Sequence, residues 1–128
     1  MKREDLSNVW VIIAAYNEAK VIAKTVSSVI GYVKNVIVVD DCSIDMTSQI
    51  ARESGAHVLS HPINLGQGAA LQTGIQYAMQ MGAEYIITFD GDGQHQVSEM
   101  LPMLFALQNS SAEIALGSRF LGKTLNLP

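Results

Sequence analysis

Residues 9–18 read VWVIIAAYNE, an unbroken apolar run that ends abruptly in three side chains with polar groups. Valine, isoleucine and alanine dominate the run, and apolar residues do not alternate with polar ones, which is typical of a strand buried on both faces. A nicotinamide-binding fold would show the spacing G-x-G-x-x-G at the following turn. Residues 14–19 instead read AAYNEA. The stretch therefore predicts a buried parallel strand and argues against a dinucleotide-binding fold.

Strand-like and helix-like segments alternate along the rest of the chain. Runs rich in β-branched residues predict strands over residues 9–15, 36–39, 56–59, 85–89 and 112–116. Helical spacing predicts helices over about residues 18–32, 45–54, 64–81 and 97–108, with Asp45 as the N-cap of the second. Such alternation predicts right-handed βαβ units. The expected fold class is α/β and Rossmann-like, a mostly parallel sheet with helices on both faces.

The first three helical segments also predict which side chains face the sheet. Their apolar residues recur at the spacing of one helical face. We expect the inward-facing set to be Val21, Ile22, Thr25, Val26, Val29, Ile30, Ile50, Ala51, Leu71, Ile75, Ala78 and Met79.

Polar residues follow three of the predicted strands at the point where each strand ends. The three clusters are Ala14-Ala-Tyr-Asn-Glu18, Asp40-Asp-Cys-Ser43 and Asp90-Gly-Asp-Gly-Gln94. The carboxyl ends of parallel strands lie at one edge of the sheet, and open α/β sheets bind ligands in the crevice beyond that edge. We therefore expect the functional site at this edge.

Asp90 and Asp92 allow three interpretations: a turn, a calcium loop or a metal anchor. A calcium loop would have glycine at its sixth position and glutamate at its twelfth, where this chain has His95 and Leu101. Glycine and aspartate suit a turn. Two carboxylates crowded at the end of a buried strand also repel each other unless a cation or hydrogen-bond donors compensate. Magnesium or manganese held between carboxylates and a diphosphate would provide that compensation.

The pair Asp40 and Asp41 poses a similar question. We expect one of them to cap the following turn or helix, and Asp41 to be free to accept from a ligand donor such as a base N–H or a ribose hydroxyl. Tyr16 could stack on a nucleobase, whereas Glu18 either binds ligand or caps the first helix. Cys42 is interpreted as a small turn residue, because no histidine lies beside it in the sequence to activate a nucleophile.

The other polar residues give weaker signals. Gly66-Gln-Gly68 lacks the third glycine and the Gly-Lys-Ser/Thr of phosphate loops, so a close turn is the expected role. The helix that it opens could still direct its N-terminal amides at an anion. His57 and His61 are expected to be ordinary surface or turn residues. His95 lies next to the acidic loop, and Arg119 could reach a phosphate or pair with that loop.

Size and charge narrow the function classes. The 128 residues are predicted to form one domain, residues 1–128. The net charge is −4 and basic residues are scattered, which argues against nucleic acid as a partner. The single cysteine excludes an internal disulfide. No window approaches the ~20 apolar residues of a membrane span, and the charged N-terminus is unlike a signal peptide. We therefore expect the chain to be cytoplasmic.

Five blocks of the sequence together resemble glycosyltransferase family 2, the inverting enzymes of GT-A fold. The resemblance is closest to the branch of dolichyl- or polyprenyl-phosphate mannosyl- and glucosyltransferases. It extends from Val9 to Phe120 and rests on VIIAAYNE, VVDDCSIDMT, NLGQGAALQTGI, DGDGQH and LGSRF. The blocks stand in the family's order and at about its distances.

The resemblance implies a metal-dependent, inverting transfer of a hexose from a GDP- or UDP-linked sugar to a polyprenyl phosphate or another hydroxyl or glycan acceptor. The donor-binding residues that it implies are Ala14, Tyr16, Glu18, Val39, Asp41, Asp90, Gly91, Asp92 and Arg119. The family's D-x-D motif corresponds to residues 90–92, with Asp92 and Gln94 holding Mg²⁺ or Mn²⁺ against the diphosphate. Arg119 would lie near the donor phosphates or the sugar.

Four features depart from the family pattern. Ala14, Cys42 and Gln67 stand where the family usually has Pro, Gly and often Lys. The fourth is length, because family members continue for about another hundred residues that build the acceptor site and supply any catalytic base. We therefore expect a donor-binding domain that ends before the acceptor half and turns over little product alone. Uncovered apolar surface would favour self-association, and the parent enzyme would work at the cytoplasmic membrane face.

Two other function classes share parts of this pattern. A non-catalytic nucleotide- or metal-binding module would carry the same motifs, and only the acceptor half distinguishes it. A receiver-like signalling domain would place its acidic pair after the first strand and a lysine after the fifth. This chain has Ala-Tyr-Asn and Ser-Arg at those two places.

Overall fold

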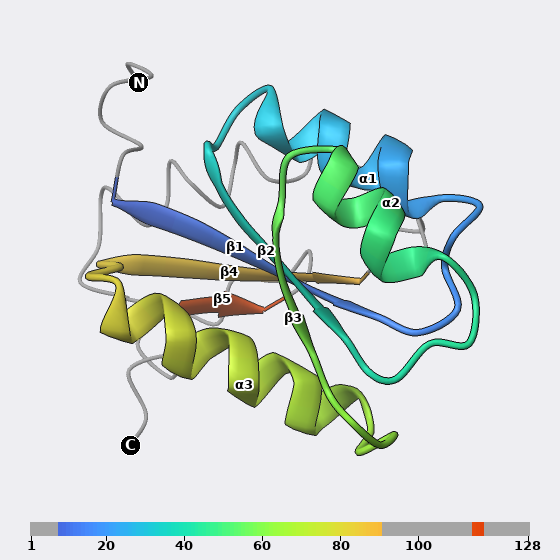
Figure 1. The fold of residues 1–128 in the computed structure, drawn as a ribbon. Coiled ribbons are helices and arrows are strands. Elements are labelled where there is room, and N and C mark those ends of the chain that lie inside the picture. Colours follow the sequence, from blue (N-terminus) through green and yellow to red (C-terminus); the bar gives the residue numbers. More distant parts are fainter. Residues whose placement is uncertain (1–7, 91–113, 117–128) are drawn as a thin grey trace.

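Five parallel strands form the centre of the protein, as the computed structural model shows for residues 8–90 and 114–116, the part of the chain that it describes (Figure 1). The strands are β1 (Val9–Ala15), β2 (Asn35–Asp40), β3 (His57–Ser60), β4 (Tyr85–Asp90) and β5 (Ile114–Leu116). Their order is β3-β2-β1-β4-β5, and each neighbouring pair is parallel. The predicted fold class and the five predicted strands are confirmed.

β1 lies in the middle of the sheet, between β2 and β4. All of its side chains except that of Ala14 are buried. Val11 and Ile13 belong to the core on one face of the sheet, whereas Trp10 and Ile12 belong to the core on the other. Both faces are therefore covered, which is why the run VWVIIAA does not alternate.

Within the described residues, three helices cover the two faces of the sheet. Figure 1 shows α1 (Ile22–Ile30) and α2 (Thr47–Glu53) on one face and α3 (Gln67–Gln80) on the other. The chain moves outward from β1 to β3 through α1 and α2, and then crosses back to β4 through α3. Because crossover connections between parallel strands are right-handed, the change of direction between β1 and β4 places α3 on the face opposite to α1 and α2.

The inward faces of α1 and α2 are largely as predicted, but one residue of α3 is not. Ile22, Thr25, Val26, Val29 and Ala51 are buried, and Ile30 and Ile50 pack against the same core. Met79 is 63% exposed, so its predicted inward position is wrong. The buried residues of α3 are the small ones, Ala70, Gly74 and Ala78. A Cβ on Gly74 would lie 2.3 Å from Ile12 Cγ2 and 3.1 Å from Val39 Cγ2. The helix therefore approaches the sheet too closely for a larger side chain.

The helices begin later than predicted. Residues 18–21 form a turn in which the Glu18 carbonyl accepts from the amides of Val21 and Ile22, at 3.0 and 2.8 Å, and α1 starts at Ile22. α3 starts only after Gly66, whose φ of 102° lies outside the helical region. The predicted helix over residues 97–108 lies outside the described residues. No helix within the described ranges is long and apolar enough to cross a membrane.

Candidate functional site

The carboxyl ends of β1, β2 and β4 meet at one edge of the sheet, as predicted. Ala14 pairs with Val39 on one side and with Asp90 on the other, so these three predicted site residues lie in one row across the sheet. The row crosses the point between β1 and β4 where the strand order reverses, the usual place for a ligand in an open α/β sheet. The Val39 side chain is fully buried in the core under α3. Val39 can therefore border a ligand only through its backbone.

The loop after β1 carries Tyr16 and Glu18 at the same edge. Tyr16 is 47% exposed, which leaves its ring accessible for stacking. The next residue, Asn17, has a φ of 54°, in the left-handed region that asparagine tolerates better than most residues. Its side-chain Oδ1 accepts from the backbone amide of Ile44, at 2.9 Å. Its own amide donates to Ser43 Oγ, at 2.7 Å. Asn17 thus turns the chain and joins this loop to the one after β2.

Two further hydrogen bonds join the same loops. The Glu18 amide donates to the hydroxyl of Thr47, at 2.9 Å, and the Ala19 amide donates to Asp45 Oδ2, at 3.2 Å. The Glu18 amide is thus satisfied by the first residue of α2. Because Thr47 is fully buried, its hydroxyl is a fixed anchor for the β1 loop. The loops after β1 and β2 therefore form one unit.

Asp45 acts slightly differently from the predicted N-cap. α2 begins at Thr47, two residues later, and the position before it is Met46, which makes no side-chain cap. Asp45 Oδ1 nevertheless accepts from the Thr47 amide, at 3.0 Å, and from the Thr47 hydroxyl. The hydrogen bond from that hydroxyl is the largest effect on Asp45, and with those from the Thr47 and Ala19 amides it outweighs desolvation and lowers the pKa of the carboxyl. Asp45 therefore fastens the start of the helix and also the β1 loop.

Asp40 is the member of the acidic pair that caps the local turn. Its Oδ1 accepts from the Ser43 amide, at 3.0 Å, and from the Ser43 hydroxyl. Its Oδ2 accepts from the hydroxyl of Ser48, which lies in α2. The side chain is 4% exposed. This confirms the prediction that one aspartate of the pair caps the turn.

Asp41 accepts three hydrogen bonds from within the chain, which the prediction did not include. Its Oδ1 accepts from His61 Nδ1, at 2.8 Å, and from the Leu65 amide, at 2.9 Å, whereas Oδ2 accepts from the Gly66 amide, at 2.7 Å. Burial alone would raise the pKa of Asp41. The hydrogen bonds from Leu65, His61 and Gly66 together outweigh burial and hold the pKa below its ordinary value. The carboxylate is therefore a built-in anion at the start of α3.

The GQG turn takes its structure from this anion. Gly66 precedes the first residue of α3, where unpaired amides point away from the helix and favour negative charge. Leu65 and Gly66 donate their amides to the Asp41 carboxylate. The expectation that these amides are directed at an anion is thus met from within the chain. The positive φ of Gly66 fits the close turn expected of this segment.

His61 is a site residue that sequence reasoning missed. Its side chain is 8% exposed and lies between Asp41 and the hydroxyl of Thr73 in α3, with both nitrogens 2.8 Å from their partners. The prediction of an ordinary surface or turn residue is wrong for His61, whereas His57 is exposed. A signal was available, because His61 directly follows β3 at the edge that carries the other polar clusters.

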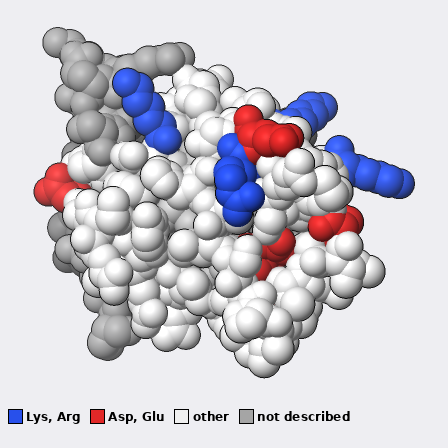
Figure 2. All heavy atoms as spheres, viewed as in Figure 1, with Lys and Arg blue, Asp and Glu red and all other residues white. Residues whose placement is uncertain are grey.

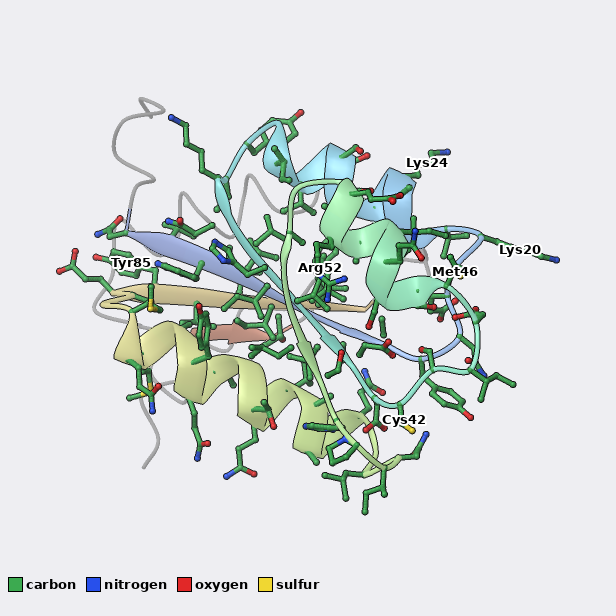
Figure 3. The ribbon with its side chains drawn as sticks, in the orientation of Figure 1. Lys20, Lys24, Cys42, Met46, Arg52 and Tyr85 are labelled. Carbon is green, nitrogen blue, oxygen red and sulfur yellow. The ribbon has the colours of Figure 1, made fainter. Side chains whose placement is uncertain are left out.

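Cys42 has a φ of 68°, which is costly for a residue with a Cβ. Its thiol lies 3.5 Å from the carbonyl oxygen of Pro62. Figure 3 places Cys42 and Met46 on the loops at the carboxyl edge of the sheet, whereas Tyr85, the first residue of β4, lies at the opposite end. The turn role predicted for Cys42 agrees with this position.

Several predicted site residues lie outside the described residues: Gly91, Asp92, Gln94, His95 and Arg119. Asp90 is the last residue of β4. Within the described ranges, no group of three or more His, Cys, Asp or Glu residues could hold a metal ion.

Charged side chains are unevenly distributed over the face drawn in Figure 2. Lysine and arginine are scattered there and acidic residues lie among them. The 14-residue helix α3 carries no charged residue at all. No basic stripe of the kind that binds a phosphate backbone is visible among the described residues on this face.

Comparison with known proteins points to one family. The model of the family described as "Glycosyl transferase family 2" matches residues 10–126. An uncharacterized protein of Methanocaldococcus jannaschii is 40% identical over 117 residues, covering 90% of this chain and 48% of that protein. The UDP-N-acetylglucosamine–dolichyl-phosphate N-acetylglucosaminyltransferase of Methanococcus voltae is 33% identical over 129 residues, covering 87% of this chain and 51% of the relative. The chain thus spans about half the length of these curated relatives.

The fold is also similar to solved enzymes. Glucosyl-3-phosphoglycerate synthase of Mycobacterium tuberculosis, in complex with Mn²⁺, UDP-glucose and phosphoglyceric acid, aligns with a TM-score of 0.67 and 25% identity. The alignment covers 82% of this chain and 40% of that one. The same synthase has been solved with Mg²⁺ and UDP.

Proposed function

Because this chain belongs to glycosyl transferase family 2 and has the GT-A fold, we propose that it is the donor-binding part of a metal-dependent, inverting enzyme. The enzyme would transfer a hexose from a GDP- or UDP-linked sugar to a polyprenyl phosphate or another hydroxyl acceptor. The dolichyl-phosphate acceptor named for the Methanococcus voltae relative supports a lipid phosphate.

The main support for the proposal is that the carboxyl ends of β1, β2 and β4 meet where the strand order changes direction, between β1 and β4. Ala14, Val39 and Asp90 lie in one row there. The loops after β1 and β2 are joined to each other by hydrogen bonds from and to Asn17. A nucleotide that binds at this edge would therefore meet loops already held in place, which lowers the cost of ordering them.

Tyr16 and Asp41 supply the contacts expected of a nucleoside site. The exposed ring of Tyr16 offers a face on which a base can stack. Among the described residues, only Gly66 donates to Asp41 Oδ2, whereas Oδ1 takes two donors. A carboxylate oxygen has two acceptor positions, so Oδ2 keeps one for a base N–H or a ribose hydroxyl. Glu18 and the backbone of Val39 would border the same ligand.

The residues that follow β4 have the chemistry of a divalent-ion site. Asp90 ends β4 and the sequence continues Gly91-Asp-Gly-Gln94. Carboxylate and amide oxygens are the donors that Mg²⁺ and Mn²⁺ take in proteins, so these residue types fit the ion. We assign Asp92 and Gln94 to it. Once bound, such an ion stabilises negative charge on a departing diphosphate.

The transfer itself would be a single displacement. An oxygen of the acceptor attacks the anomeric carbon from the side opposite the diphosphate, the bond from that carbon to the diphosphate oxygen breaks, and the configuration inverts. A lipid phosphate brings an oxygen that is already anionic, so such an acceptor needs no general base. Arg119 is assigned to the donor phosphates, where a guanidinium offers paired N–H donors.

Titration calorimetry with UDP and GDP, each with and without Mn²⁺, tests the proposal and identifies the base. We expect one of the two nucleotides to bind in a metal-dependent manner and Asp92→Ala to remove that dependence. Glu53→Gln, at the far end of α2, is the matched control and should bind as the wild type does. If neither UDP nor GDP binds, the proposed donor site is refuted. Binding that ignores both the metal and Asp92→Ala would overturn the metal assignment alone.

A further inference from the structure

The hydrogen-bonded group formed by Asp41, His61 and Thr73 joins three separate segments of the edge. Asp41 directly follows β2, His61 directly follows β3, and Thr73 lies in the second turn of α3. The imidazole spans the gap, with Nδ1 2.8 Å from Asp41 Oδ1 and Nε2 2.8 Å from Thr73 Oγ1. The side chains of His61 and Asp41 are 8% and 5% exposed, so water screens this contact little.

The direction of each hydrogen bond follows from the chemistry of the partners. A carboxylate can only accept, so His61 Nδ1 carries the proton and donates it to Asp41. In the neutral ring Nε2 is then an acceptor, and the Thr73 hydroxyl donates to it. The ring is thus held at both ends, and it in turn holds one oxygen of the carboxylate.

His61 also determines which face of the carboxylate remains available. Oδ1 is occupied by His61 and by the Leu65 amide, while Oδ2 accepts from Gly66. Without His61, only the amides of Leu65 and Gly66 among the described residues would hold the carboxylate, and its plane could tilt about χ2, because that torsion is broad. With His61, Oδ1 is fixed and the remaining acceptor position of Oδ2 keeps one direction.

We propose that His61 is a positioning residue of the donor site, which holds the Asp41 carboxylate against the start of α3 and aims its remaining acceptor position at the nucleotide. The second half of this inference rests on the proposed function, whereas the first half does not. Thr73 supports the arrangement by fixing the other side of the ring. His61 itself does not need to touch the nucleotide.

Two substitutions separate the two ends of the ring. The amide nitrogen of asparagine replaces Nδ1, so His61→Asn keeps a donor for Asp41 and loses the contact with Thr73. The longer glutamine places its amide where Nε2 was, so His61→Gln keeps the Thr73 contact and loses the donor for Asp41. His57→Gln is the control, because His57 is exposed and its ring lies near the rings of Trp10 and Tyr77.

The first measurement is hydrogen exchange of the Leu65 and Gly66 amides by NMR, which needs no ligand. We expect His61→Gln to speed exchange of both amides by at least ~10-fold, because a hydrogen bond to a charged group is lost, and His61→Asn to leave it within ~3-fold of the wild type. Equal protection in His61→Gln and the wild type, or equal loss in both variants, would overturn the positioning role. A variant that fails to fold would lose protection throughout the sheet, not only at these two amides. In that event, the imidazole ¹⁵N chemical shifts of His61 in the wild-type protein provide the test. The arrangement requires the tautomer with the proton on Nδ1, and finding the proton on Nε2 would refute it.

The second measurement is the affinity for whichever of UDP or GDP binds the wild type in the presence of Mn²⁺. We expect His61→Gln to weaken binding by ~10-fold or more, His61→Asn to restore it to within ~3-fold, and His57→Gln to bind as the wild type does. Unchanged affinity in His61→Gln despite faster amide exchange would refute the link to the nucleotide. If neither nucleotide binds the wild type, the proposed function and this link fall together, and the exchange result still decides whether His61 positions Asp41.

Discussion

Replacing Gly74 by alanine is the sharpest test of how α3 sits on the sheet. Gly74 is buried in the middle of α3 and faces β1 and β2. A Cβ at this position would lie 2.3 Å from Ile12 Cγ2, 3.4 Å from Ile12 Cδ1 and 3.1 Å from Val39 Cγ2. The first of these distances is too short for two carbon atoms, so either Ile12 or the helix has to move. Ile12 is fully buried, which leaves it little room to do so.

Two opposing effects set the size of the change. Overfilling a packed core costs about 1–3 kcal/mol, whereas alanine in place of glycine favours the helix by about 0.5–1 kcal/mol. We therefore expect Gly74→Ala to lower the free energy of unfolding by about 1–2 kcal/mol, which for a domain of this size lowers Tm by about 4–8 °C. Gly68 lies in the same helix with nothing within 4 Å of a Cβ and no positive φ. Gly68→Ala should therefore raise stability by up to about 1 kcal/mol.

Urea unfolding followed by circular dichroism measures both variants under the same conditions, with thermal unfolding as a check. The two alanines have the same intrinsic helix preference, so opposite signs of the change isolate the contact with Ile12. Gly74→Ala as stable as Gly68→Ala would refute the close approach of α3 to β1. A change in the slope of the urea curve would indicate an altered denatured state instead and would call for the comparison of Tm alone.

Three further changes probe the edge of the sheet. The pKa of Asp41 is held below its ordinary value of 3.8, so its carboxylate stabilises the fold above about pH 4 and loses that effect as the pH falls through the lowered pKa. Asp41→Asn should therefore remove about 1–3 kcal/mol at pH 7 and flatten the acid limb of the stability curve, measured by urea unfolding across pH; an equally steep limb would contradict this. Cys42 has a φ of 68°, so Cys42→Gly should raise the free energy of unfolding by about 0.5–1 kcal/mol, and a lower urea midpoint would show that the thiol contact matters more. Thr47→Val leaves the Glu18 amide without its acceptor and should cost about 1–3 kcal/mol, whereas a loss below the error of the urea measurement would mean that water replaces the hydroxyl.

Local sequence patterns were sufficient to predict the strands. The strand around Val11 is buried because helices cover both faces of the sheet. Such a strand is continuously apolar, so its composition alone distinguishes it from the polar turns that flank it. The placement of the polar clusters at one edge followed from the parallel arrangement and is confirmed by the row of Ala14, Val39 and Asp90. These features depend on local composition and on one rule of topology.

The features that were missed depend on contacts between segments far apart in the sequence. Met79 is apolar and was predicted to face inward, but it is 63% exposed, while the close approach of Ile12 and Val39 to Gly74 puts small residues at the buried positions of α3. His61 looked like a surface residue because nothing near it in the sequence indicates that β2 and α3 bring Asp41 and Thr73 to its two nitrogens. A spacing pattern carries no information on such a contact.

The segment from Asp40 to Thr47 divides into two interleaved sets of positions. Asp40, Asp41, Ser43, Asp45 and Thr47 each make side-chain hydrogen bonds that fix a neighbouring loop or helix. Cys42, Ile44 and Met46 alternate with them and are half-buried or exposed, Ile44 at 89%. A library that randomises only residues 44 and 46 would therefore vary the surface presented at this edge while retaining the framework that holds it, whereas the φ of 68° at Cys42 restricts that position. Changes in ligand preference at this edge can accordingly be sought by directed evolution at these two positions, with little loss of folded protein.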